Sequence, residues 1–586
     1  MLGWHQGKAA YKSLADIQAL IASYATSKIP LESIWNDVSY MNARRVFTVD
    51  PVAYAGLGAY VADTMHKNGQ KYVPIVGAGL AYTPDDYSYR PFRDGLASKV
   101  FINEFSNQNP FVGTAIGGQV VYPDWTATNT AAFWSSQLDS FLTLTNFDAL
   151  WLDSNEATNF CNGACLDSQI KPQSVKLSMP YWPTGRDLNE QSIDLDAVHA
   201  NNRNELEMHN VFALQQTKLT HDWFQNKKMR VAIASRASFA GQGKFGGRSF
   251  GENYSTVEDM KASVAGVMTM NIFGIPIGAP NVCGFIGDVS AELCARWTKL
   301  SSFYPYARNH HNGDASPVSV VFAGEYKDAR VPKTTFRDIM TVAIQQKYNL
   351  IPYAYSNLIE LRQKGGVYFK PLFFAFPEDL ALYNRNFNDF LLGDSLKVSI
   401  EVTKLGATRS QFYFPTATWC PLWEMDSPCL VITGNNKDNL QELYSSADVS
   451  HVHMREGKIV VTANLWNAEK IMTTKDMRAL PVDLHLAPML NGAGNVGFQA
   501  FEDMWYTDDG ENFDSTDLTK GSVNGYQFYM SAFTSAASWL IEVQHKLKAT
   551  QSTDTTCFAM SGNDYLGDVY VHNAPTVGIQ LDNYIG

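Results

Sequence analysis

The strongest constraint on the fold is a pattern that repeats between residue 30 and about residue 310, where short apolar runs alternate with longer helix-like segments. Each run ends in polar or charged residues. Alternating strands and helices of this length predict a parallel α/β sheet, and closure into a (β/α)8 TIM barrel is the form that most often fits about 350 residues with long loops. We therefore predict a barrel over residues 1–365. The runs are IPLESIWND, KYVPIVGAG, FDALWLDSNE, MRVAIASRAS, IFGIPIGAPN and SSFYPYARNHH.

Beyond about residue 365 the pattern changes to strand-like alternation with turn signals, as in SLKVSIEVT and GKIVVTANLW. Alternation of this kind predicts antiparallel β-sandwiches. The chain has 586 residues, which is more than one hydrophobic core accommodates. We predict a proximal C-terminal β-sandwich over residues 366–475 and a distal one over residues 476–586.

The charge of the chain argues against some classes of partner. Acidic residues number 58 against 46 basic ones, and no long Lys/Arg run is present, so nucleic acid and anionic membrane surfaces are not expected partners. The uncharged stretch 262–287 contains two Pro and two Asn, which fits a buried helix leading into a strand better than a membrane span. No signal peptide is visible at the N-terminus, so we expect a mature, truncated or cytosolic chain.

Seven cysteines bear on the compartment. Short loops between paired cysteines can be bridged, which favours a secretory, lysosomal or extracellular location, whereas buried free thiols are an equally good interpretation of any single pair. Zinc is not expected, because no CxxC couple has a second ligand couple. Six of the seven fall into locally spaced pairs, which are Cys161/Cys165, Cys283/Cys294 and Cys420/Cys429, and Cys557 is left over.

Candidate site residues follow the predicted strands. The string FDALWLDSNEATNF places Asp153 and Glu156 where a strand ends. Such carboxylates often do no more than cap the next helix. The other polar residues at predicted strand ends decide between a helix cap and a site residue, because the C-terminal ends of barrel strands carry the chemistry of barrel enzymes. The residues at predicted strand ends are Asp37, Asp153, Arg236, Asn281 and His310.

The segment SRASFAGQGKFGGRSFGENYS contains Gly241, Gly243 and Gly246 in a formal GxGxxG spacing, which allows a dinucleotide-binding interpretation. A helix should begin directly at these glycines, yet the polar and aromatic RSFGENY follows. We therefore favour a loop over a cleft that carries Glu252 towards the strand ends.

These strings carry a family resemblance. WLDSNEATNF resembles the WxDMNExSxF signature of glycoside hydrolase family 31, which includes lysosomal acid α-glucosidase, sucrase-isomaltase, maltase-glucoamylase and the catalytic subunit of ER glucosidase II. PLESIWNDVSYMNARRVFT, SRASFAGQGKFGG and FYPYARNHHN are similar to further family strings in the same order, and PLFFAFPED and MWYTDDGE look like its C-terminal signatures. The resemblance covers nearly the whole chain.

The resemblance implies a retaining exo-α-glucosidase that acts on terminal α-linked glucose of glucans or oligosaccharides, with no metal or organic cofactor. Asp153 falls on the nucleophile of the family and Glu252 on its acid/base, which we expect to be partly buried and protonated. Retention requires the two carboxyl groups to lie only ~5 to 5.5 Å apart. The other residues assigned by the resemblance or by their place near strand ends are the hydroxyl-binding Asp37, Arg236 and His310, the stacking candidates Trp35, Trp151, Trp182 and Phe250, and the disulfide pair Cys283 and Cys294.

Departures from the family pattern leave a second function open. Position 252 is Glu instead of Asp, Ser249 replaces a pocket Trp, Ser154 replaces a Met, and Ser39 and Asn281 stand where the family usually has Asp. A displacement of about an ångström can cost on the order of 10²-fold in rate. The alternative is a catalytically impaired homologue that binds sugar or serves as an assembly subunit. The N-terminal β-sandwich of the family is also missing, and we expect it to be removed, absent or present as another chain.

Overall fold

The computed structural model describes residues 2–571, apart from 106–108, 167–168, 171–189, 314–333, 385–387, 425–426, 435–438, 466–470, 488, 490–500, 509, 511–523, 533–538 and 548–565. The chain divides into two compact units. The Asp153 unit comprises Gln6–Ala22 and Ser33–Gly251, and the C-terminal unit comprises Met1–His5, Ser23–Glu32 and Glu252–Gly586.

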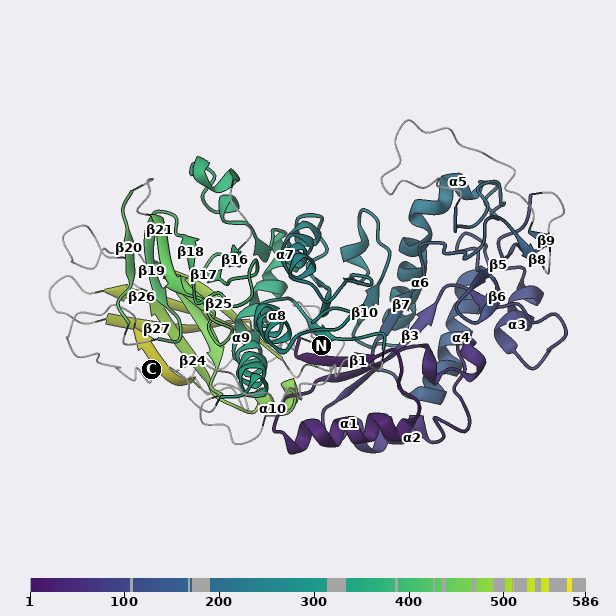
Figure 1. The fold of residues 1–586 in the computed structure, drawn as a ribbon, viewed down its shortest axis with the longest axis horizontal. Coiled ribbons are helices and arrows are strands. Elements are labelled where there is room, and N and C mark those ends of the chain that lie inside the picture. Colours follow the sequence, from purple (N-terminus) through teal and green to yellow (C-terminus); the bar gives the residue numbers. More distant parts are fainter. Residues whose placement is uncertain are drawn as a thin grey trace. The chain divides into compact units, whose positions relative to one another are not determined.

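Parallel strands form the centre of the Asp153 unit. Their hydrogen-bonded order is β11-β10-β7-β3-β2, and Figure 1 shows β3, β7 and β10 next to one another. Every residue of β2, β7 and β10 is buried, as expected for parallel strands that are covered on both faces. The strands are β2 (Ser33–Asn36), β3 (Lys71–Gly77), β7 (Leu150–Asp153), β10 (Ile233–Ser235) and β11 (Gly247–Ser249).

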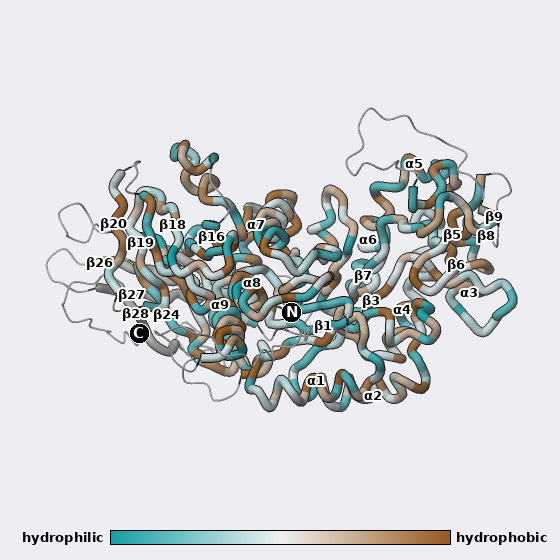
Figure 2. Tube along the Cα trace, viewed as in Figure 1, coloured by the Kyte–Doolittle hydropathy of each residue, from teal (hydrophilic) through white to brown (hydrophobic). Residues whose placement is uncertain are grey.

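The helices around this sheet are amphipathic. Helix α1, which begins in this unit, buries Leu14, Ile17 and Ile21, and its apolar and polar residues alternate in Figure 2. Helices α4 and α6 pack together, and Trp134 Nε1 of α4 donates to Thr220 Oγ1 of α6 at 3.0 Å. The helices are α1 (Leu14–Thr26), α2 (Leu57–Tyr60), α3 (Arg90–Ser98), α4 (Thr130–Thr145), α5 (Glu205–Met208) and α6 (Phe212–Asn226), with short helices η1 (Val38–Tyr40), η2 (Asn42–Arg44), η3 (Val61–Met65), η4 (His209–Val211) and η5 (Gln242–Lys244).

The excursions between the strands contain a buried ionic cluster. His199 lies between Asp124 (Nδ1 to Oδ1, 3.0 Å) and Glu205 (Nε2 to Oε2, 2.8 Å), and all three residues are at most 3% exposed. Burial lowers the pKa of His199, but its hydrogen bonds to the two carboxylates outweigh burial and raise the pKa to about 9. The short strands of these excursions are β4 (Leu80–Ala81), β5 (Val112–Ala115), β6 (Gly118–Val121), β8 (Cys165–Leu166) and β9 (Gln169–Ile170).

In the C-terminal unit, strands β13 and β14 pair in parallel with Asn281 opposite Arg308. Helix α7 ends before β12, which confirms that the stretch 262–287 is a helix leading into a strand. Among the described residues, no helix has both the length and the apolar character that a membrane crossing requires. The elements are β1 (Trp4–Lys8), which begins in this unit, α7 (Val257–Ile272), β12 (Gly278–Ala279), β13 (Asn281–Val282), α8 (Ala291–Ser301), β14 (Ala307–Asn309) and α9 (Phe336–Lys364).

Antiparallel sheets follow α9. A six-stranded sheet has the order β15-β16-β17-β22-β19-β20, and its core contains Phe414 and Trp419, both fully buried. Strands β24 and β28 pair in parallel, which the alternation did not predict. The boundaries near residues 365 and 475 stay predictions. The elements are β15 (Phe369–Lys370), η6 (Leu372–Phe374), η7 (Leu380–Asn384), β16 (Asp389–Leu392), β17 (Leu396–Ser399), β18 (Arg409–Tyr413), β19 (Ala417–Pro421), β20 (Leu430–Ile432), β21 (Leu440–Tyr444), β22 (His451–Arg455), β23 (Lys458–Ala463), α10 (Thr474–Met477), β24 (Val482–Ala487), β25 (Phe501–Thr507), β26 (Asn524–Ala532), β27 (Trp539–Leu547) and β28 (Leu566–Val571).

Candidate active site

Three of the predicted site residues lie at the carboxyl ends of parallel strands in the Asp153 unit. Asp153 is the last residue of β7 and pairs with Gly77 at the end of β3. Arg236 follows β10, and its backbone N–H donates to Leu152 O at 2.9 Å. Asp37 follows β2 and caps η1 by accepting from Val38 N at 2.7 Å. Asp37 therefore caps a helix as well as occupying a strand end, so the two interpretations of such carboxylates coexist in one residue.

An ionic group surrounds the Asp153 carboxylate. Arg236 Nη1 lies 3.8 Å from Asp153 Oδ2, and Arg236 Nε lies 2.7 Å from Glu156 Oε1. Ser154 Oγ donates to Asp153 Oδ2 at 3.2 Å, and the backbone of Ser154 adopts a left-handed conformation with φ of 50°. The Ser that stands in place of the family Met thus contributes a hydrogen bond to the predicted nucleophile.

Burial dominates the electrostatics of Asp153. The residue is 7% exposed, and desolvation raises the pKa of its carboxyl group to about 7. Arg236 and the hydroxyl of Ser154 lower the pKa, while the negative charges of Glu156 and Asp37 raise it. Burial therefore acts against the ionised form that the resemblance implies for the nucleophile, and Arg236 acts in its favour.

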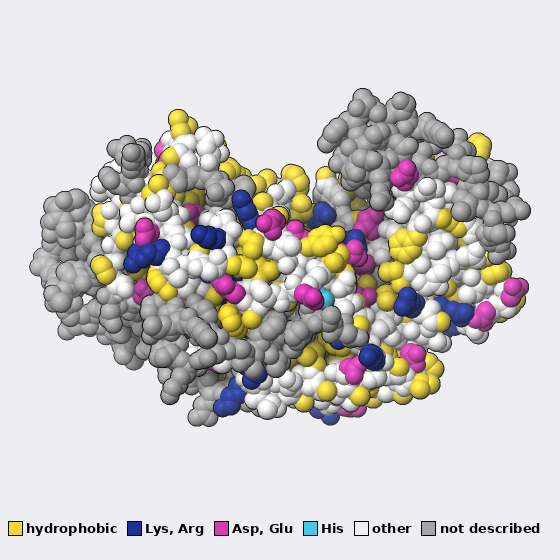
Figure 3. All heavy atoms as spheres, in the orientation of Figure 1, with side chains coloured by type: hydrophobic (Ala, Val, Ile, Leu, Met, Phe, Trp, Pro, Cys, Tyr) yellow, Lys and Arg dark blue, Asp and Glu magenta, His cyan; other side chains and the backbone are white. Residues whose placement is uncertain are grey.

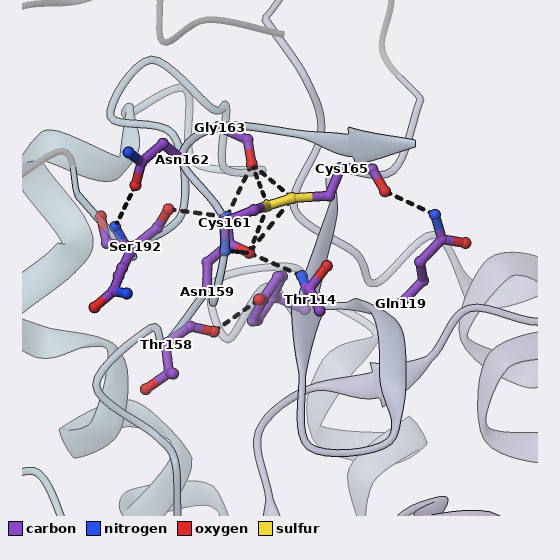
Figure 4. Close-up of a disulfide and its surroundings, with 11 residues drawn as sticks. Thr114, Gln119, Thr158, Asn159, Cys161, Asn162, Gly163, Cys165 and Ser192 are labelled. Atoms are coloured by element: carbon purple, nitrogen blue, oxygen red, sulfur yellow. Dashed lines mark hydrogen bonds between the residues drawn. A yellow bond between two sulfur atoms is a disulfide. The ribbon is translucent and has the colours of Figure 1, made fainter. Parts of the chain in front are cut away.

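The loop after β7 is held by a disulfide between Cys161 and Cys165, whose Cα atoms lie 6.6 Å apart (Figure 4). Beside it, the buried Asn159 accepts from Thr114 N at 2.8 Å and donates to Gly163 O at 2.9 Å and to Ser192 O at 3.2 Å. These contacts tie the loop to the hairpin of β5 and β6. The cysteine pair is visible in the sequence. It follows Asp153 closely along the chain, and this proximity is the sequence signal that could have linked the disulfide with the site.

The aromatic candidates are mostly buried. The rings of Trp35 and Trp151 have centroids 5.8 Å apart, and the two residues are 2% and 5% exposed. Trp151 precedes Asp153 by two residues within β7, so these two side chains share one side of the strand. Phe250 is half-buried, with the Arg248 guanidinium carbon 6.0 Å from its ring centroid. Stacking of Trp151 and Phe250 on sugar stays a prediction, and Trp182 lies outside the described residues.

Arg248 was missed in the sequence. Its Nη1 donates to Ser238 Oγ at 2.8 Å. Burial lowers its pKa, and the charge of Arg236 lowers it further, while Glu156 opposes the shift. Arg248 thus lies within electrostatic reach of both Glu156 and Arg236. Ser249, which stands in place of the pocket Trp, is 2% exposed on the neighbouring strand β11.

The remaining candidates belong to the C-terminal unit. His310 is 1% exposed and stacks on Phe285, with ring centroids 5.2 Å apart. Asn281 Oδ1 accepts from Arg308 Nη2 at 2.6 Å. Glu252 is exposed as a residue and begins a segment of this unit, and the partial burial and protonation of its carboxyl group stay predictions. The approach of its carboxyl group to Asp153 stays a prediction. Ser39, in the Asp153 unit, lies 3.2 Å from the hydroxyl of Tyr54.

Three disulfides are present among the described residues, so the free-thiol interpretation is wrong for each local pair. Cys283 and Cys294 are bonded with Cα atoms 4.6 Å apart, as the family resemblance implied. Cys420 and Cys429 are bonded with Cα atoms 4.2 Å apart. Cys557 lies outside the described residues. Disulfides of this number are consistent with an oxidising compartment.

Within the described ranges, no group of three His, Cys, Asp or Glu residues has the arrangement of a metal site. The face in Figure 3 shows acidic and basic side chains interspersed among the described residues, with no continuous basic patch of the kind that binds phosphate backbones.

Comparison with protein families assigns most of the chain. Residues 1–357 match the family model described as the glycosyl hydrolases family 31 TIM-barrel domain, and residues 365–460 match that of the glycosyl hydrolase family 31 C-terminal domain. These matches confirm the predicted barrel and the resemblance on which the site residues were assigned.

Related proteins are similar over most of this chain. The alpha-glucosidase of Hordeum vulgare is 32% identical over 78% of this chain and 50% of its own length, and the lysosomal alpha-glucosidase of Mus musculus is 30% identical over 87% of this chain and 52% of its own. The chain thus spans about half the length of these curated relatives. A dextranase of Flavobacterium johnsoniae in complex with glucose has the same fold, with a TM-score of 0.75 and 20% identity over 94% of this chain and 62% of that one.

Proposed function

The chain belongs to glycosyl hydrolase family 31, and from this premise we propose that it is a retaining exo-α-glucosidase that removes terminal α-linked glucose from glucans or oligosaccharides. The observation that carries the proposal is the buried carboxyl group of Asp153 at the end of β7, with Arg236 Nη1 at 3.8 Å. A carboxylate held by a nearby cation at the carboxyl end of a barrel strand has the chemistry and the location of a glycosidase nucleophile.

The reaction would proceed in two displacements. In the first, an ionised oxygen of Asp153 attacks the anomeric carbon and forms an ester, the bond from that carbon to the glycosidic oxygen breaks, and Glu252 donates its proton to the departing oxygen. In the second, Glu252 takes a proton from water, the water oxygen attacks the anomeric carbon, and Asp153 leaves as a carboxylate. Two inversions at one carbon leave the α configuration unchanged.

Protonation of Asp153 would limit the rate at low pH. Its pKa is raised to about 7 by burial, so acid converts the nucleophile to its unreactive form. Arg236 opposes this by stabilising the ionised form, and Asp37 and His310 are the proposed partners of the glucose hydroxyls. Trp151 and Phe250 are the proposed apolar contacts of the sugar ring.

The names of the relatives support an α-linked substrate but not a single sugar. The barley and mouse relatives are named alpha-glucosidases, whereas a relative from Arabidopsis thaliana that is 29% identical over 83% of this chain is named alpha-xylosidase 1. We propose glucose as the terminal sugar and an extracellular or lysosomal location in the secretory pathway, which the three disulfides support.

Two observations favour a second candidate, a catalytically impaired homologue that binds sugar or serves as a subunit. Glu252 is one methylene longer than the family Asp, and burial raises the pKa of Asp153 to about 7. Both properties act against a reaction that needs one ionised and one protonated carboxyl group in fixed positions.

The experiment that separates these functions is hydrolysis of p-nitrophenyl α-glucoside and α-xyloside by the purified chain. We expect faster release from the α-glucoside, an α-configured first product, and loss of release in Asp153→Asn. Asp50→Asn is the matched control, because the carboxylate of Asp50 accepts hydrogen bonds from the nearby backbone N–H groups of Val52 and Ala53. No release by the parent chain, together with glucose binding by calorimetry, would instead support the impaired homologue.

A further inference from the structure

One buried amide side chain contacts both neighbours of Arg236. Asn155 is two residues beyond Asp153 and is fully buried. Its Nδ2 donates to Ser235 Oγ at 2.8 Å, and its Oδ1 accepts from Ala237 N at 3.0 Å. Ser235 and Ala237 flank Arg236, so Asn155 is hydrogen-bonded to the chain on both sides of that arginine.

The same amide is anchored to a helix. Asn155 Nδ2 also donates to Gln216 Oε1 on α6 at 3.0 Å, and Ser235 Oγ donates to Ala237 O at 2.8 Å. Asn155, Gln216 and Ser235 are each 0% exposed. Removing one partner from such a network leaves buried polar groups without hydrogen bonds, so the loops after β7 and β10 are strongly held in one arrangement.

The side chain of Arg236 is confined as well. Its Nε contacts Glu156 Oε1 at 2.7 Å, and a Cβ atom placed on Gly251 would lie 3.3 Å from the guanidinium group. The backbone of Gly251 therefore lies against the guanidinium, and there is little room for it to shift. With its backbone held by Asn155 and its head group held by Glu156, Arg236 reaches Asp153 in a defined geometry.

We infer that Asn155 is a positioning residue, which holds Arg236 so that its guanidinium group stays within reach of the Asp153 carboxylate. The inference rests on the proposed function only for the meaning of that carboxylate in catalysis. The side chain of Asn155 is hydrogen-bonded to Gln216, Ser235 and Ala237, so it acts through the backbone of residues 235–237.

The test compares Asn155→Ala with Asn271→Ala. Asn271 is a matched control, because it is 1% exposed and its amide also bonds to backbone, donating to Val267 O at 3.0 Å and accepting from Phe369 N at 3.1 Å. Each variant is made with Asp153 and with Asn at position 153. The difference in melting temperature between the two members of each pair, followed against pH, gives the pKa of Asp153 without any need for activity.

We expect Asn155→Ala to raise the pKa of Asp153 by up to about one unit, since a nearby opposite charge typically lowers a carboxyl pKa by about one to three units. Asn271→Ala should leave it unchanged. In an Arg236→Ala background the shift caused by Asn155→Ala should disappear, because the two changes act through one contact. In an active parent chain, the acid limb of kcat/KM should move by the same amount.

Equal shifts in Asn155→Ala and Asn271→Ala, or a shift that persists without Arg236, would overturn the inference. A parent chain without activity contradicts the proposed function alone, because the pKa measurement stands without turnover. Ser235→Ala gives a second check, since it removes a hydrogen-bond partner of Asn155 and should shift the pKa of Asp153 in the same direction.

Discussion

Replacing Asp153 with Asn should stabilise the chain at neutral pH while removing activity. Asn has the shape of Asp without the ionisable proton, so the exchange isolates the cost of ionising a buried carboxyl group. Arg236 keeps a carboxylate partner in the variant, because its Nε contacts Glu156 at 2.7 Å. The exchange therefore leaves no buried cation without a partner.

The size of the stabilisation expected for Asp153→Asn follows from the pKa of Asp153. In the folded chain the pKa of Asp153 is about 7, against 3.8 for the ordinary carboxyl group. The folded state thus binds the proton more tightly than the unfolded state. The destabilisation caused by ionising buried Asp153 is therefore absent below the unfolded pKa and grows as pH rises to the folded pKa. At 1.36 kcal/mol per unit it reaches about 4 kcal/mol above about pH 7, and it grows by about 2 to 3 kcal/mol between about pH 5 and about pH 7.5.

Urea unfolding at several pH values measures this difference. We expect the free energy of unfolding of Asp153→Asn, relative to that of the parent chain, to rise by about 2 to 3 kcal/mol between about pH 5 and about pH 7.5. Asp50→Asn should show no such rise over this range, because backbone hydrogen bonds from Ala53 and Val52 lower the pKa of Asp50, so its stabilisation is fully present above the unfolded pKa of 3.8 and is lost only at lower pH. A constant difference for Asp153→Asn across this range would refute the reasoning, since Asp153 would then be ionised throughout.

Three further predictions concern other groups. Glu252→Gln should abolish hydrolysis of maltose but spare the first step with activated leaving groups, which stopped-flow release of p-nitrophenol measures; equal loss on both substrates would contradict its role as acid. Replacing Cys161 and Cys165 with Ser should lower the free energy of unfolding by about 2 kcal/mol in urea, as the small ring that they close implies, and an unchanged midpoint would contradict this. The raised pKa of His199, about 9, gives stability that is fully present below its unfolded pKa of 6.5 and is lost as pH rises through the folded value, so His199→Gln should lower the melting temperature more at pH 6 than above about pH 9. A pH-independent loss would show that His199 is neutral in the fold.

The sequence predicted the parallel strands and the place of several site residues. Apolar runs such as ALWL before Asp153 are short and bounded by polar residues, which is a local property of the chain. Parallel strands bring their carboxyl ends to one edge, so Asp153 and Arg236 could be expected to meet. The family motifs added the roles of these residues and the pairing of Cys283 with Cys294.

Other properties were decided by tertiary structure. The pKa of Asp153 depends on its burial and on the distances to Arg236 and Glu156, none of which a motif specifies. The hydrogen bonds of Asn155 and the exposure of Glu252 also depend on how loops from distant parts of the chain are placed. The sequence by itself determined which residues stand at strand ends, because periodicity and spacing are local; tertiary structure decided how those residues are charged and held, because desolvation and ionic contacts arise only between packed segments.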